Sequence, residues 1–96
     1  MNWFKAQTTL GKREKRKIAN NTYLIKRGEN FAIRLHNTDI ITITPDGLIL
    51  NSGGFRTRTT KQRINDFTKA RIYQEKFEWF IGDKPFEDGM FIPFRD

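Results

Sequence analysis

Cysteine is absent from this chain of 96 residues, so no disulfide bond can stabilise its fold. A small protein without cysteine is typical of a reducing compartment. No apolar run approaches the roughly 20 residues that a membrane-spanning helix needs. The first ten residues also lack the long apolar segment of a secretory signal peptide. We therefore expect a soluble protein of the cytoplasm.

Groups that carry out chemistry are scarce as well. The chain has one histidine, His36, and no cluster of the three or four Cys, His or carboxylate ligands that a zinc site needs. His36 and Asp39 are separated by a turn, which does not place a base beside a nucleophile. Glu87 and Asp88 are adjacent, so on a strand they would point to opposite faces and form no acid–base pair. We predict no catalytic residue, no metal and no cofactor, and hence no enzymatic activity.

Aromatic residues and positive charge are what the chain does contain. Nine Phe, two Trp and two Tyr can build a core in one small domain, although such a chain buries only about 60–65% of its unfolded surface. The net charge is +7 and is unevenly distributed. Residues 1–71 carry 15 Lys/Arg and 5 Asp/Glu, a balance of +10, whereas residues 72–96 carry a balance of −3. This charge favours a polyanionic or acidic partner, namely nucleic acid or an acidic protein.

Alternation of apolar and polar residues predicts strands through the middle of the chain. Phe31, Ile33 and Leu35 share one face of a strand. Asn37-Thr38-Asp39 interrupts the pattern, as a bulge or tight corner would, and Pro45-Asp46-Gly47 favours a turn. We expect an antiparallel meander with strands at residues 22–27, 31–36, 40–44 and 48–50.

The rest of the chain predicts one helix and a second β region. Thr59 and Gln62 are spaced as in a capping box, so a short helix is expected near residues 60–70. Residues 72–74 and 77–81 indicate a hairpin, and Pro93 would place a last strand at a sheet edge. The predicted fold class is therefore α+β: a small antiparallel sheet, made of the meander and the C-terminal hairpin, with one short helix near 60–70 and a possible N-terminal helix.

The basic run at residues 12–17 marks the boundary that we expect between an N-terminal region and the main domain. Such a run can form a short solvated helix or a disordered arm, and we favour the helix. We accordingly predict a basic N-terminal arm or short helix over residues 1–20 and a single α+β domain over residues 21–96.

Several stretches resemble a group of small bacteriophage and prophage proteins. These stretches are Asn20-Asn21-Thr22-Tyr23-Leu24, Leu35-His36-Asn37-Thr38-Asp39-Ile40, Asn51 to Asn65 (NSGGFRTRTTKQRIN) and Phe86-Glu87-Asp88-Gly89-Met90. The resemblance covers roughly residues 20–92 and leaves the basic N-terminal run outside. It implies a phage protein acting inside a bacterial host cell, where small proteins often serve host takeover or anti-defence. No active-site residue can be carried over from the group.

Two segments are candidates for polyanion binding. Their cations can contact backbone phosphates with little sequence preference. The predicted nucleic-acid-binding residues are Lys12, Arg13, Lys15, Arg16, Lys17, Arg56, Arg58, Lys61 and Arg63.

The start of the predicted helix is also a candidate anion site. Gly53 and Gly54 allow a close approach to the backbone, and Thr59 and Thr60 add hydroxyl donors at a helix N-terminus. The spacing is not that of a P-loop. A purely structural interpretation stays open, in which the glycines make a turn, Thr59 caps the helix and the cations are solvated.

The leading hypothesis is a non-enzymatic, phage-encoded protein that binds nucleic acid. One alternative is a protein that binds and inhibits a host protein, and another is sequestration of a small phosphorylated ligand at the helix start. The sequence does not decide between DNA and RNA. The oligomeric state is also open, although pairing of exposed edge strands would give a homodimer.

Overall fold

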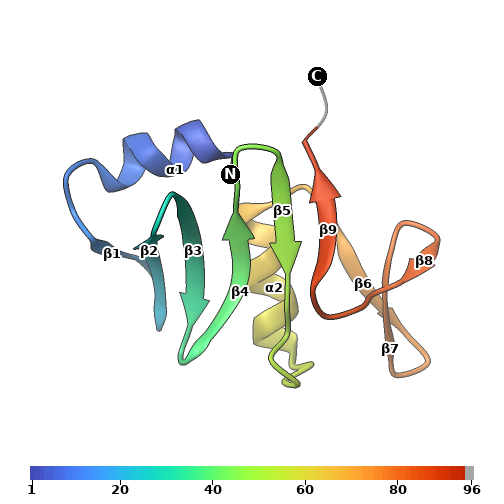
Figure 1. Cartoon of the computed structure of the whole chain (residues 1–96). Coiled ribbons are helices and arrows are strands. Elements are labelled where there is room, and N and C mark those ends of the chain that lie inside the picture. The colour runs from blue at the N-terminus through green and yellow to red at the C-terminus, as the bar shows by residue number, and fades with distance from the viewer. Residues whose placement is uncertain (95–96) are drawn as a thin grey trace.

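The computed structural model describes residues 1–94, which form two helices and nine strands. Five antiparallel strands follow one another as a meander, and the last strand of the chain returns to pair with the fifth (Figure 1). The elements are α1 (Trp3–Leu10), β1 (Lys15–Ala19), β2 (Thr22–Arg27), β3 (Asn30–Leu35), β4 (Thr38–Ile43), β5 (Gly47–Leu50), α2 (Arg58–Phe67), β6 (Ile72–Glu75), β7 (Glu78–Ile81), β8 (Lys84–Pro85) and β9 (Met90–Pro93).

Two antiparallel sheets result from this order. The large sheet has the strand order β1-β2-β3-β4-β5-β9, and the small sheet has the order β6-β7-β8. The predicted α+β class, with a meander and a C-terminal hairpin, is confirmed. Pro93 lies on β9, which is the edge strand of the large sheet. An edge strand has a neighbour on one side only, so it tolerates a residue without an N–H.

One face of the large sheet carries the core. The register aligns Leu24 with Ile33, Ile33 with Ile41 and Ile41 with Leu50, and all four side chains are fully buried. Both helices cover this face, α1 across the ends of β2 and β3 and α2 behind β4 and β5 (Figure 1). Ala6 and Leu10 of α1 and Ile64 of α2 belong to the same apolar cluster as the four strand residues.

The prediction that the basic run is a helix or a disordered arm is wrong. Lys15 to Ala19 form the edge strand β1, in which Lys15 pairs with Ile25 and Lys17 with Tyr23. A run of consecutive cations shows no apolar alternation, so the sequence pattern does not reveal a strand that is held by backbone pairing with β2. An N-terminal helix is present, but it is α1, which precedes the basic run. It begins after Asn2, whose side chain accepts a hydrogen bond from the Lys5 amide at 2.8 Å.

The helix near residues 60–70 is confirmed, but it begins earlier than the capping pattern predicts. Thr57 is the N-cap, and its Oγ1 accepts a hydrogen bond from the Thr60 amide at 3.2 Å. Thr59 is exposed and lies in the first turn instead. Both residues are threonines with the same capping chemistry, so a local sequence pattern does not distinguish them.

The interruption expected at residues 37–39 is a tight turn followed by a bulge. His36 adopts a left-handed backbone conformation, with φ of 54°, at the turn between β3 and β4. The β3–β4 register then shifts between Ile33 and Arg34, which pair with Ile41 and Asp39. Ile40 is therefore the extra residue, and it is buried against the core.

Replacing the cap distinguishes the two threonines. We expect Thr57→Ala to lower the free energy of unfolding by about 1 kcal/mol, because it removes the acceptor for an orphan amide of α2. Thr59→Ala, at an exposed position, should change it by no more than about 0.5 kcal/mol. Urea denaturation of the two variants measures the difference, and an equal loss in both would contradict the cap assignment.

Candidate functional site

The cations of the basic run lie on an exposed edge of the large sheet. Lys12 and Arg13 are in the turn after α1, and Lys15, Arg16 and Lys17 are in β1, all of them exposed. Within residues 1–94, none of the five forms an ion pair with a carboxylate. Arg16 donates one hydrogen bond, from Nη1 to the carbonyl oxygen of Thr9, at 2.7 Å. These charges are therefore available to an external anion.

The four predicted cations near α2 do not act as one group. Arg56 lies over the rings of Trp79 and Phe86, at 5.7 and 5.1 Å from their centroids, and so packs against the small sheet. Arg58 is exposed and Lys61 half-buried. Arg63 is held in place by Thr22 Oγ1, to which its Nε donates at 3.1 Å, and by Asp66 on its own helix at 3.4 Å.

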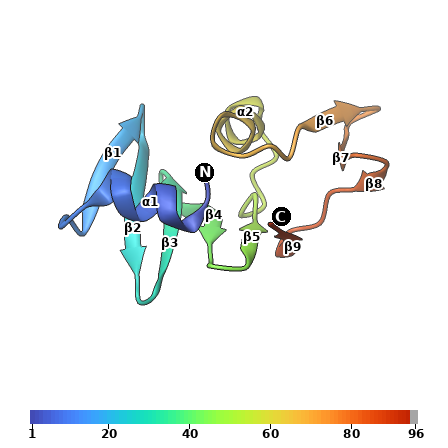
Figure 2. The same ribbon diagram turned by 90° about the horizontal axis from the view of Figure 1, so that it is seen from above.

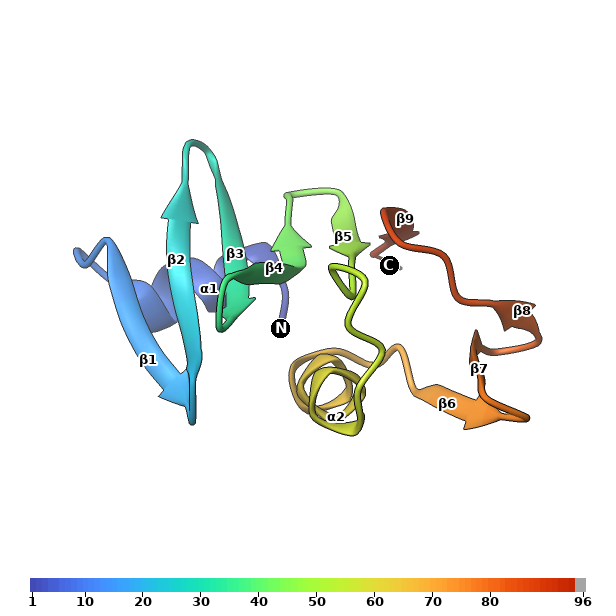
Figure 3. The ribbon, with the colours of Figure 1, turned by 90° about the horizontal axis from the view of Figure 1, so that it is seen from below.

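The contact between Arg63 and Thr22 joins α2 to the β1–β2 hairpin, because Thr22 pairs with Ala19 at the end of β1. β1 is the edge strand of the large sheet, and α2 packs on the core face of that sheet (Figures 2 and 3). The two predicted groups are therefore linked at Arg63 but do not share one face. Lys15 and Lys17 point away from the core face that α2 covers, and Arg56 packs on the small sheet. The small sheet, which holds most of the acidic tail, lies at the opposite end of the molecule from β1 (Figure 3).

A surface that the sequence did not predict lies on the other face of the large sheet. We call it the outer face, because within residues 1–94 the apolar cluster that holds both helices is on the opposite face. Strand register assigns the following side chains to the outer face: Lys15 and Lys17 of β1, Tyr23, Ile25 and Arg27 of β2, Ala32 and Arg34 of β3, Asp39 and Thr42 of β4, Ile49 of β5 and Phe91 of β9.

Tyr23 occupies the cationic half of this face. The Lys15 ammonium lies 5.1 Å and the Arg34 guanidinium 5.7 Å from the centroid of its ring. The alternation of Tyr23, Ile25 and Arg27 with inward residues was the available signal, but nothing in it indicates that the neighbouring strands contribute cations at the same place. The carboxylate of Asp39, the register partner of Arg34, is ion-paired with Arg27 at 3.1 Å, so Arg34 and Lys15 have no ion pair of their own within residues 1–94.

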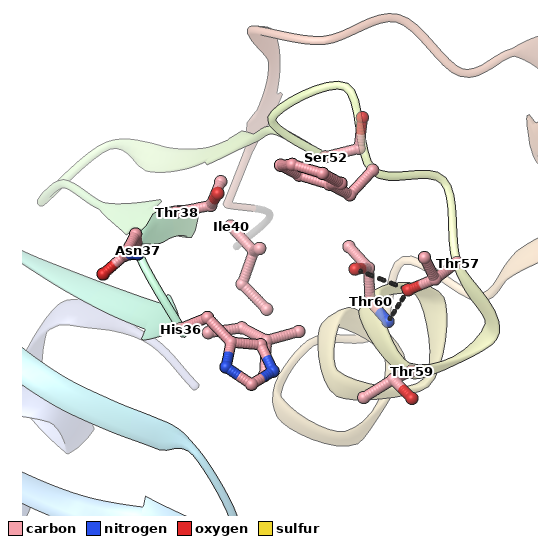
Figure 4. A pocket seen from close by; sticks show the side chains of 10 residues that line it. His36, Asn37, Thr38, Ile40, Ser52, Thr57, Thr59 and Thr60 are labelled. Atoms are coloured by element: carbon pink, nitrogen blue, oxygen red, sulfur yellow. Dashed lines mark hydrogen bonds between the residues drawn. The ribbon is translucent and has the colours of Figure 1, made fainter.

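A groove of about 440 Å³ separates the β3–β4 turn from the start of α2. Figure 4 shows His36 and Ile40 on the sheet side, facing Thr57 and Thr60 of the helix side. The lining residues are Leu35, His36, Asn37, Thr38, Ile40, Ser52, Phe55, Thr57, Thr59 and Thr60. The predicted anion-binding threonines, Thr59 and Thr60, thus line a real depression.

The two predicted anion-binding glycines use their amides within their own loop. The Gly53 amide donates to Asn51 Oδ1 at 2.7 Å, and the Gly54 amide donates to Ser52 Oγ at 3.2 Å. Gly53 is required sterically, because a Cβ there would lie 2.6 Å from the Thr38 side chain and its φ is +64°. A phosphate bound to these amides would have to displace the internal acceptors.

Asp88 fixes this loop to the end of the chain. Its carboxylate accepts hydrogen bonds from the Ser52 amide at 2.8 Å and from the Ser52 hydroxyl at 2.8 and 3.1 Å. Ser52 is buried, and the Gly89 amide adds a bond of 2.7 Å to the carbonyl oxygen of Leu50. The Asp88 carboxylate therefore holds β9 against β5, and it places a negative charge beside the loop.

Membrane-spanning helices and metal clusters are both absent from the described part of the chain. Neither α1 nor α2 is long and apolar enough to cross a bilayer. Among residues 1–94, no three His, Cys or carboxylate groups are arranged to hold a metal ion.

The fold and the cations that have no carboxylate partner within residues 1–94 define a small basic α+β protein. Residues 4–93 match the family model described as Kyanoviridae Gp96 protein, and the chain belongs to this phage protein family. The match supports the resemblance to phage proteins, and it includes the basic run that the resemblance had left outside. Neither a curated protein nor a solved structure gives a significant match to the chain.

Removing the charge of Asp88 should loosen the end of the chain. We expect Asp88→Asn to lower the free energy of unfolding by about 1.5–3 kcal/mol, since it weakens hydrogen bonds between a charged group and a buried serine. Glu87→Gln, at the exposed neighbouring position, is the matched control and should have an effect below about 0.5 kcal/mol. Thermal unfolding followed by circular dichroism measures both, and equal stability of the two variants would contradict the role of Asp88.

Proposed function

We propose that this phage protein is a non-enzymatic binding protein whose basic side contacts nucleic acid through backbone phosphates. The observation that carries the proposal is the set of five exposed cations at residues 12–17 that have no carboxylate partner within residues 1–94. Cations that stay unpaired in a folded protein release the counterions of a bound polyanion, and this release drives association.

The position of the acidic residues supports the same proposal. The negative charges of the C-terminal third lie mostly on or beside the small sheet, at the opposite end from β1 (Figure 1). At physiological ionic strength the Debye length is about 8 Å, whereas the longest dimension of the molecule is 43 Å. The acidic end therefore does not cancel the field at β1.

Salt dependence tests the proposal directly. We expect binding to a DNA duplex, measured by fluorescence anisotropy, to weaken steeply between about 50 and 200 mM salt. Lys12→Gln combined with Lys17→Gln should lower the slope of log K against log salt by about 1.8, or about 0.9 for each phosphate that is no longer neutralised. Circular dichroism of the variant verifies that it is folded.

The chain offers a charge-matched control on the small sheet. Lys76→Gln combined with Lys84→Gln removes the same charge from the far end and should leave the slope nearly unchanged. An equal reduction in both double variants would mean that only net charge matters. Absence of binding by the unmodified protein at low salt would overturn the proposal.

A second candidate, inhibition of a host protein, is favoured by Phe77. Its side chain is 95% exposed at the tip of the β6–β7 hairpin. Lys76 and Phe77 both have positive φ, 52° and 70°, in a two-residue turn where Asn-Gly is the usual sequence. A strained, exposed phenylalanine in a turn between Glu75 and Glu78, with one lysine beside it, favours a protein partner with an apolar pocket over a polyanion.

Pull-down from a bacterial lysate treated with nuclease distinguishes this candidate. Under the nucleic-acid proposal, every captured partner should be lost after nuclease treatment. Under the second candidate, a protein partner survives nuclease and is lost with Phe77→Gly, a change that should leave the hairpin intact because glycine suits a positive φ. A surviving partner that Phe77→Gly still captures would contradict the role of Phe77.

The third candidate, a small phosphorylated ligand at the start of α2, has less support. The amides of Gly53 and Gly54 are already hydrogen-bonded, and the Asp88 carboxylate lies beside their loop.

A further inference from the structure

We propose that the outer face of the large sheet binds single-stranded nucleic acid, with an unpaired base stacked on Tyr23 and adjacent phosphates on Lys15, Lys17 and Arg34. The inference rests on the proposed nucleic-acid function and specifies which form is bound. It starts from the location of Tyr23, on the second strand of the sheet and directly opposite Lys17 on one side and Arg34 on the other.

The charge on this face selects an anionic ligand. Four cations and one carboxylate lie on it, and that carboxylate, Asp39, is already paired with Arg27. Lys15, Lys17 and Arg34 have no carboxylate partner within residues 1–94. Arg34 is the clearest case, because its Nε atom is buried and finds no hydrogen-bond acceptor among those residues. The Arg34 side chain as a whole is only half-buried, so a small turn of its guanidinium group would let it donate to a phosphate oxygen or a base carbonyl.

The aromatic ring among these charges selects a single strand. Tyr23 is half-buried, and the Lys15 and Arg34 cations are near its ring. In a duplex the base faces are stacked on each other, so none of them is accessible to the ring of Tyr23. In a single strand a base can stack on the ring while Lys15 turns to the neighbouring phosphate, and stacking of this kind tolerates any sequence.

The face continues far enough to hold several nucleotides. From Tyr23 on β2 to Phe91 on β9 there are four strand spacings, or about 19 Å at roughly 4.8 Å each. Phe91 is 49% exposed, and its ring lies against Gly47, where a Cβ would approach it to 2.6 Å. Phe91 shares a register row with the uncharged residues Ile49 and Thr42, and Tyr23 lies in the adjacent row with Arg34 and Asp39. A strand running across the sheet would therefore meet cations at the β1 end and an aromatic ring at each end.

Oligonucleotide binding tests this inference. The probes are fluorescent oligothymidylate and oligouridylate of about 12 nucleotides, within the range of site sizes known for sheet-based binding domains, and a DNA duplex of the same length. We expect both single strands to bind more tightly than the duplex. Tyr23→Leu should weaken single-strand binding by about 5- to 100-fold and leave duplex binding and the salt slope unchanged, because it removes a stacking surface and no charge.

Three controls separate stacking from folding. Tyr23→Phe keeps the ring and should retain single-strand affinity within about twofold. Tyr73→Leu removes the other tyrosine, which lies on the small sheet, and should not change single-strand affinity. In NMR spectra of the unmodified protein, the ring resonances of Tyr23 should shift on adding oligothymidylate, whereas those of Tyr73 should not.

The outcomes distinguish this inference from the proposed function. If single strands and duplex bind equally and Tyr23→Leu has no effect, the outer-face inference is overturned while backbone binding by the basic run stands. If the unmodified protein binds none of the probes at low salt, both fail. A preference for single strands that Tyr23→Leu abolishes and Tyr23→Phe retains supports the inference.

Discussion

Pairing of the five-strand meander is the interaction on which the rest of this molecule depends. The register that aligns Leu24, Ile33, Ile41 and Leu50 gives the sheet one fully apolar face, and both helices pack on that face. Since side chains alternate along a strand, the same register necessarily collects Lys15, Tyr23 and Arg34 on the opposite face. A slip of one residue would exchange the two faces. The core and the candidate binding surface are therefore two consequences of one pairing scheme.

The parts of this fold that were predictable from sequence are those determined by local patterns. Alternation over residues 31–35 and the turn at Pro45–Gly47 indicated the meander correctly, and the capping-box spacing of Thr59 and Gln62 indicated α2. The edge strand β1 was missed because Lys15, Arg16 and Lys17 are all cations, so no alternation of apolar and polar residues marks a strand. Only the backbone pairing with β2 shows that they form one. The cap was misplaced for a related reason, since Thr57 and Thr59 are both plausible caps by residue type and only the folded chain selects Thr57.

The sequence predicted some of the cations that belong to the candidate site, but it did not predict how their side chains are arranged. Five of the nine predicted cations lie together along β1 and the turn before it, but Arg56 packs on Trp79 and Phe86, and Arg63 is occupied by Thr22 and Asp66. The environment of Tyr23 was not predictable, because it combines residues from β1, β2 and β3 whose mutual register is set by turns and a bulge. The number of charges can be read from a sequence. That Lys15 and Arg34 lie beside the ring of Tyr23 follows only from the pairing of the strands in the folded sheet.

The pairing of β9 with β5 has a consequence for how the chain folds during its synthesis. Leu50 pairs with Met90, so the β5 edge of the large sheet stays unpaired until β9 has been synthesised. During that interval the backbone groups of β5 can pair with any extended segment nearby, and the other edge, β1, is protected by its lysines and arginine. A chain that ends before β9 would thus expose β5 as an unpaired edge strand, so β9 protects the sheet from aggregation as well as completing it.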